Sequence, residues 1–274
     1  MKRKRLPKAP LAEAVFEMRW ALVGPQGPEA ILFATDPGFA PALEAFTRLV
    51  TKAGFPVIRN MNEGSNTVAG PHSVVRRFYA KEGFGFPLLQ IGSGIFASNQ
   101  ATDYDWKEFK KQALKGIGFL TTSYPKMRDF PFKPVHMELR YIDAFDETIA
   151  ETNDLIAFIN EATEFKIAIP DFLNDKKHFA GPTSGRNIFT RQIAKRKSTS
   201  LYMDIASAQR STGARIIRIE SKITSLADDV PKFRTAAAFA KDVSKWLDSA
   251  HDILSPLFER VVQPQIMQKF KADN

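Results

Sequence analysis

The two stretches that decide the fold are FEMRW at residues 16–20 and MELRY at residues 137–141. In each of them an apolar residue, Glu, an apolar residue, Arg and an aromatic residue follow one another, and the two copies lie 121 residues apart. Alternation of apolar and polar side chains is typical of a strand with one buried face, so strands are expected at residues 14–22 and 135–142. The shared pattern predicts that the chain contains two related units.

The segments that follow these strands support the same division. In the first half, apolar spacing predicts a helix over 39–53, strands over 73–80, 87–91 and 95–98, and a helix that contains Trp106 and Leu120. In the second half, it predicts a helix at about 151–162, strands over 187–193, 201–206 and 215–224, and a long helix that starts near Pro231 and that Pro256 should kink or break. Each half therefore has the element order β-α-β-β-β-α.

The predicted fold class is α+β, with two duplicated β-α-β-β-β-α units, antiparallel sheets, a long C-terminal helix and a pseudo-twofold arrangement. We expect a basic disordered arm at residues 1–10, a first α+β unit at 11–133 and a second α+β unit at 134–274. Helices should cover one face of each antiparallel sheet and leave the other face for a neighbour, a ligand or solvent.

Composition excludes several classes of protein. The chain has 274 residues, of which 44% are hydrophobic, so it can bury a full core. It has no apolar run of about 18 residues, and its basic start does not lead into a hydrophobic stretch, which argues against a transmembrane helix and a signal peptide. The absence of cysteine excludes disulfides, thiol nucleophiles and Cys-based metal sites. These features predict a cytoplasmic protein that does not associate with membranes.

The net charge is concentrated at one end of the chain. Of the formal +9, five charges come from Lys and Arg within residues 2–8, so the body is only mildly basic. This arm is either a phosphate-seeking tail or a solvated start of the chain. Two of the three smaller basic clusters are Arg76-Arg77, next to Phe78 and Tyr79, and Lys195-Arg196-Lys197, which is expected at a hairpin turn; the third is Lys110-Lys111.

No motif for catalysis or cofactor binding is present. The sequence contains neither a glycine-rich dinucleotide or phosphate loop nor a nucleophile elbow. The four histidines have no chelating spacing. We therefore predict no catalytic residues, no cofactor and no metal site.

The candidate binding residues are the two basic clusters and the charged pairs of the opening strands. Glu17 and Arg19, like Glu138 and Arg140, lie two residues apart and share one strand face. They form either a row of cross-strand salt bridges or a polar recognition row where the two halves meet. The full set is Arg76, Arg77, Lys195, Arg196, Lys197, Glu17, Arg19, Glu138 and Arg140.

The chain also resembles a known group of proteins. The resemblance rests on LPKAPLAEAVFEMRW at residues 6–20, PLLQIG at 87–92, YDWKEF at 104–109, LRYID at 139–143, and LDSAHDI with LFE between 247 and 259. These segments look like a sporadically distributed family of uncharacterised bacterial and archaeal proteins of about 250–270 residues. The resemblance implies a prokaryotic cytosolic protein, with no activity or site residue to carry over. Patchy inheritance of this kind favours a mobile-element or defence context.

Two classes of function follow from these observations. The first is a non-enzymatic binding or regulatory protein that presents a sheet face or groove to a macromolecular partner, with protein favoured over nucleic acid. A variant of this first class is a nucleic-acid-binding protein, which would use the basic arm and the hairpin tips. The second class is an enzyme that acts on a phosphorylated or nucleotide substrate, with a carboxylate such as Asp143 or Glu17. A deep pocket holding a carboxylate and an Arg would favour the enzyme, and a shallow continuous face would favour binding.

Overall fold

The computed structural model describes residues 10–24, 34–61, 70–83, 85–101, 104–150, 154–164, 185–209 and 213–264, with positions 152, 166–168, 170, 172, 177, 178 and 268. The basic arm lies outside the described residues, apart from residue 10. The strands are β1 (Leu11–Trp20), β2 (Val57–Asn60), β3 (Val74–Tyr79), β4 (Leu88–Gly92), β5 (Ile95–Gln100), β6 (Pro134–Asp146), β7 (Arg186–Gln192), β8 (Thr199–Gln209) and β9 (Arg215–Leu226). The helices are α2 (Phe39–Lys52), α3 (Trp106–Ser123), α4 (Glu147–Ala150), α5 (Leu155–Ala162) and α6 (Ala236–Val261).

All described strands belong to one antiparallel sheet, which confirms the α+β class and the antiparallel pairing. The strand order is β2-β3-β4-β5-β1-β6-β9-β8-β7, so the order in one half mirrors the order in the other around the β1–β6 pair. The sequence predicts a separate sheet for each unit, whereas the structure shows a single sheet. The reason is that β1 and β6 pair along nearly their whole lengths, from Leu11↔Asp143 to Trp20↔Pro134.

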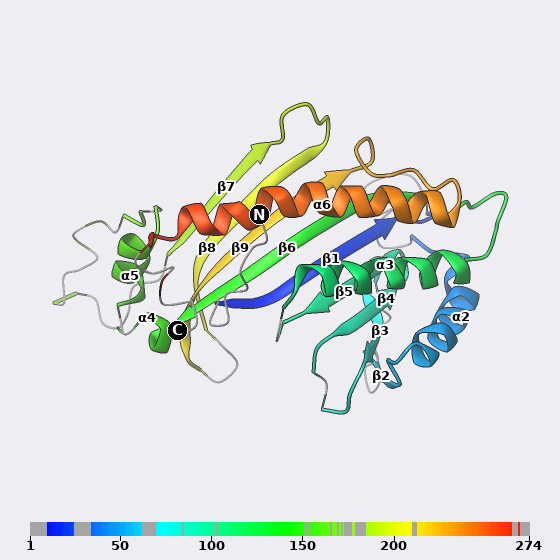
Figure 1. Cartoon of the computed structure of the whole chain (residues 1–274), viewed down its shortest axis with the longest axis horizontal. Coiled ribbons are helices and arrows are strands. Elements are labelled where there is room, and N and C mark those ends of the chain that lie inside the picture. The colour runs from blue at the N-terminus through cyan, green and yellow to red at the C-terminus, as the bar shows by residue number, and fades with distance from the viewer. Residues whose placement is uncertain are drawn as a thin grey trace.

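The helices pack on one face of this sheet (Figure 1). Phe16, Met18 and Trp20 of β1 point to that face and form a buried cluster with Phe239 and Trp246 of α6. The cluster also contains residues of α2 and α3, so both halves of the chain contribute to the same core. A second buried cluster packs α4, α5 and the end of α6 against β6, β8 and β9. Because successive strand residues point to opposite sides, the polar residues of β1 lie on the face away from the helices.

The two long helices begin at side-chain caps. Asp105 accepts hydrogen bonds from the backbone N–H groups of Lys107 and Glu108 at the start of α3. Thr235 accepts one from Ala238, so α6 begins at Ala236, after the start expected near Pro231. The long C-terminal helix is confirmed, and it continues through Pro256 to Val261.

Side-chain hydrogen bonds and a ring stack connect the N-terminal end of α3 with β6 and α6 within the helical layer. The Tyr141 hydroxyl lies 2.8 Å from the Tyr104 hydroxyl and 2.7 Å from Nδ1 of His251. The His251 ring stacks on Trp106, with 3.9 Å between ring centroids. These contacts give His251 a structural role between the two long helices.

Candidate functional site

The site begins with the two strands at the centre of the sheet. In β1 the core side chains alternate with Glu17 and Arg19, and in β6 they alternate with Glu138 and Arg140. Because their apolar neighbours face the helices, these four side chains share the other side of the sheet. We call that side the charged face.

Two carboxylates meet at the middle of the charged face. Glu17 and Glu138 are direct partners in the β1–β6 register. Like charges in such a position destabilise a sheet unless cations offset them. The Arg19 Nε donates to the Glu17 carboxylate at 2.6 Å, and Lys222 Nζ lies 3.2 Å from the Glu138 carboxylate. Arg140 Nε lies 3.6 Å from the Glu138 carboxylate as well.

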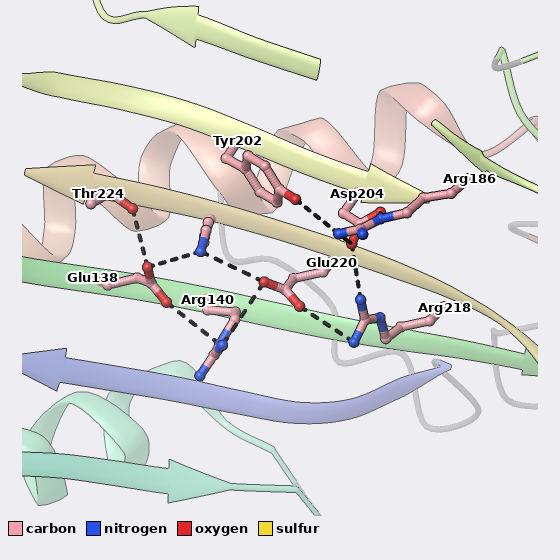
Figure 2. Close-up of polar contacts among 9 residues, drawn as sticks. Glu138, Arg140, Arg186, Tyr202, Asp204, Arg218, Glu220 and Thr224 are labelled. Atoms are coloured by element: carbon pink, nitrogen blue, oxygen red, sulfur yellow. Dashed lines mark hydrogen bonds and ion pairs between the residues drawn. The ribbon is translucent and has the colours of Figure 1, made fainter. Parts of the chain in front are cut away.

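The charges continue without interruption across β9 and β8 (Figure 2). Glu220 lies 3.8 Å from Lys222, 3.9 Å from Arg140 and 3.8 Å from Arg218. Arg218 also lies 2.9 Å from the carboxylate of Asp204. The row that reaches β7 contains Glu138, Arg140, Lys222, Glu220, Arg218, Asp204 and Arg186, in which cations and carboxylates are interleaved.

The carboxylates in this row are buried beneath the longer cationic side chains. Asp204 is 1% exposed, Glu138 6% and Glu220 8%. The bidentate hydrogen bonds from Arg186, at 2.8 Å each, lower the pKa of Asp204 below its usual value, and the Arg218 charge adds to this effect. Arg186 and Arg218 therefore favour the ionised form of Asp204.

His136 is the titratable group beside the central pair. It lies opposite Arg19 in the register, and burial lowers its pKa below the usual value, although Glu138 pulls in the opposite direction. Its Nδ1 is buried and has no hydrogen-bond partner among the described residues. His136 thus adds a buried polar atom beneath the charged face.

A second polar row crosses the other half of the charged face. Arg77 donates to Gln90 at 2.8 Å, Gln90 donates to Asn99 at 2.7 Å, and Asn99 donates to Glu13 at 2.6 Å. These residues come from β3, β4, β5 and β1 in spatial order. The hydrogen-bonded face therefore extends over both halves of the sheet.

The structure brings together only part of the predicted residue set. Glu17, Arg19, Glu138, Arg140 and Arg77 lie on the charged face. Arg76 points to the helical side, where it donates to Thr47 at 2.8 Å and lies 3.3 Å from Glu44, both on α2. The third group, Lys195, Arg196 and Lys197, lies exposed at the turn between β7 and β8.

Five members of the charged row lie outside the predicted set of binding residues. These are Arg186, Asp204, Arg218, Glu220 and Lys222. Three of them lie in β9, where they alternate with Ile217, Ile219 and Ser221, and this period of two could have identified them. Asp204 carries no such signal because it is the lone charge in β8.

The charged face offers ion-pairing and hydrogen-bonding groups. Among the described residues, no group of three or more His, Asp or Glu side chains is arranged to hold a metal ion. A groove of about 520 Å³ lies on the helical side, lined by Trp106, Lys107, Lys110, Lys111, Leu114, Ser244 and Asp248 of α3 and α6. It is therefore separate from the charged face.

Comparison with known proteins assigns no family. No family model matches the chain, and no curated protein is significantly similar to it. The resemblance to the sporadically distributed prokaryotic family thus stays a prediction. Within the described part of the chain, every helix is too short or too polar to cross a membrane.

Proposed function

We propose that this chain is a non-enzymatic binding protein that presents its charged face to a protein partner. The observation that carries the proposal is the interleaving of paired cations and carboxylates on the sheet face that the described helices leave uncovered. Side chains held in ion pairs lose little further conformational entropy when a partner binds, which favours recognition by a preformed surface.

The dimensions of the face suit a macromolecule. Nine strands spaced by about 4.8 Å give a width of about 38 Å. With strands of ten residues or more at its centre, the face offers roughly 1,000 Å². A standard protein interface buries about 800 Å² on each partner, so one face of this sheet is large enough.

The signs of the charges favour protein over nucleic acid. The carboxylates of Glu13, Glu17, Glu138, Asp204 and Glu220 lie between the cations of this face, and they would repel phosphates. A nucleic-acid-binding surface needs uncompensated positive charge. A protein partner can instead offer charges of both signs in a complementary pattern.

The enzyme alternative has less support. Glu17 is ion-paired with Arg19, and Asp143 is buried on the helical side between the sheet and the helices. An active site requires a concave pocket in which a substrate meets such groups. The groove lined by described residues lies between α3 and α6 and contains neither Asp143 nor Glu17.

We also propose that the two halves arose by duplication about a pseudo-twofold axis through the β1–β6 pair. The spacing of 121 residues relates Glu17 to Glu138, and these same two residues are direct partners in the register. The mirrored strand order supports this origin, although β2 has no counterpart among the described residues of the second half. Duplication would give each half a strand bearing Glu and Arg, and pairing would join them into one contact surface.

Co-purification with matched variants tests the protein-binding function. A tagged full chain would be isolated from its native host as wild type, as Arg19→Ser on the charged face and as Lys245→Ser on the exposed side of α6. We expect a protein that wild type and Lys245→Ser retain equally, that Arg19→Ser retains about tenfold less well, and that nuclease does not release. Equal recovery by all three forms, or no retained protein at all, would contradict the proposal.

Fluorescence anisotropy tests the nucleic-acid alternative. Labelled single- and double-stranded DNA and RNA would be titrated with the full chain and with a form lacking residues 2–5, at low and at physiological salt. We expect binding that disappears with the arm or with salt, because the charged face is already neutralised by ion pairs. Binding that survives both changes would place nucleic-acid recognition on the folded body.

A further inference from the structure

The strand β7 forms one edge of the sheet, and six of its seven residues are exposed. Among the described residues it is hydrogen-bonded on one side only, to β8. It is seven residues long, whereas β2 at the opposite edge has four. A long exposed edge offers a row of backbone groups to a further strand. In Figure 1 the hairpin of β7 and β8 extends past α6.

The direction of the free backbone groups follows from the pairing. Ser207 donates its N–H to Gly185, and Ile193 donates its N–H to Thr199. Along an antiparallel strand, residues alternate between the two neighbours, so the odd-numbered residues bond to β8. Arg186, Ile188, Thr190 and Gln192 therefore direct their N–H and C=O groups outward.

Two large apolar side chains lie beside these groups. Ile188 is 51% exposed and Phe189 is 44% exposed. They point to opposite faces of the sheet, because they are adjacent in the strand. An added strand would cover both of them along with the backbone edge.

The charge around this edge has one sign. Residues 186–197 contain five cations and no carboxylate. Arg186 is bound to Asp204, whereas Arg191, Lys195, Arg196 and Lys197 form no ion pair with a described residue. The turn that holds the last three directly follows β7, so its charge lies at the C-terminal end of the strand. The charge complement of this edge is an acidic segment.

We propose that β7 binds an extended acidic segment of a partner protein, which adds to the sheet as a tenth strand. The proposal deepens the protein-binding function above and rests on it for the class of partner. In antiparallel pairing, the N-terminal end of the added segment lies beside the Lys195–Lys197 turn. The segment should therefore have its carboxylates first, followed by alternating β-branched residues that contact Ile188 and Phe189.

A labelled peptide tests this site with the purified full chain. The probe is fluorescein-Asp-Glu-Asp-Val-Thr-Ile-Thr-Val, and the direction control has the same residues in reverse order. We expect saturable binding of the probe, weaker binding of the reversed peptide, and a Kd that rises with salt. No saturation below about 1 mM, or equal binding of both peptides, would overturn the proposal.

Two tests with substituted proteins locate the binding site, and the first of them changes Thr190. Thr190→Pro removes an outward N–H and keeps the hydrogen bonds to β8, and Thr190→Val changes the same side chain without removing that donor. We expect Thr190→Pro to raise the Kd about tenfold and Thr190→Val to leave it within about twofold, with melting temperatures confirming that both fold.

The second test uses the double variant Arg196→Ser/Lys197→Ser, which leaves Lys195 in its left-handed backbone position. It should raise the Kd about tenfold at low salt and reduce its salt dependence. Unchanged affinity in Thr190→Pro or in the double variant would refute binding at this edge. Because Arg19 lies on β1 and outside this edge, failure here would leave the co-purification test of the charged face unaffected.

Discussion

Replacing Asp143 with Asn should stabilise the protein at alkaline pH and have little effect at acidic pH. Asp143 lies on β6 between Tyr141 and Phe145, with Leu11 and Ile219 as its partners on the neighbouring strands, and it is 5% exposed. Burial raises its pKa to about 7. Its side chain faces the helical layer, so the charged form has lost most of its hydration.

The size of the stability change follows from the linkage between proton binding at Asp143 and folding. Because the folded pKa exceeds the unfolded value of about 3.9, the folded state binds this proton more tightly. The contribution of Asp143 to the free energy of unfolding is therefore highest below about pH 4, falls as pH rises towards 7, and levels off above it. A shift of about 3 pKa units corresponds to about 4 kcal/mol at full ionisation.

The assay is urea denaturation of wild type and of Asp143→Asn at pH 4, 6 and 9. We expect similar stability at pH 4 and a variant that is more stable by about 2 to 4 kcal/mol at pH 9. Asp242→Asn, which removes an exposed carboxylate on α6, controls for the change in net charge. If the difference between wild type and Asp143→Asn is the same at pH 4 and pH 9, the reasoning about burial is refuted.

Two further predictions concern packing and charge. A Cβ on Gly116 of α3 would lie 2.4 Å from the Phe96 ring, whereas one on Gly118 meets nothing within 4 Å. Thermal unfolding should therefore show Gly116→Ala destabilised by about 1 to 3 kcal/mol and Gly118→Ala stabilised by about 0.5 kcal/mol, and the reverse order would contradict this packing. Asp204→Asn should cost about 1 to 3 kcal/mol at pH 7, because it weakens charged hydrogen bonds from Arg186. The pKa of Asp204 is lowered in the folded protein, so its contribution to stability is present above about pH 4 and disappears as pH falls further. If the stability that Asp204→Asn loses does not change with pH in an acid titration, the prediction is contradicted.

Most of the elements could be predicted because their periodicity is strong. The period of two in β1, β6 and β9 and the helical spacing in α2, α3 and α6 located these elements to within a few residues. The periodicity does not predict β2 and α4, because these elements have four residues each and carry too short a pattern. It placed the start of α6 near Pro231, whereas the cap is Thr235.

The long-range pairing could not be predicted from local patterns. Whether β1 and β6 form two sheet edges or one central pair depends on contacts between segments about 121 residues apart. The residues that make up the charged face also depend on long-range pairing. The Glu and Arg pairs identified the charged face, but the contribution of Asp204 depends on Arg186 and Arg218, which come from two other strands. Arg76 and Arg77 are adjacent in sequence, and only the strand alternation sends them to opposite sides.

Site-specific photo-crosslinking in the native host tests most directly whether the charged face contacts a protein. A photoreactive benzoylphenylalanine would replace Tyr202 on the charged face or, as the matched control, the partly buried Phe119 on α3. Both positions already hold an aromatic ring, so the replacement is conservative. We predict a nuclease-resistant protein adduct from position 202 and none from position 119. The opposite pattern, or a position 202 adduct that nuclease removes, would contradict a protein-binding function for this face.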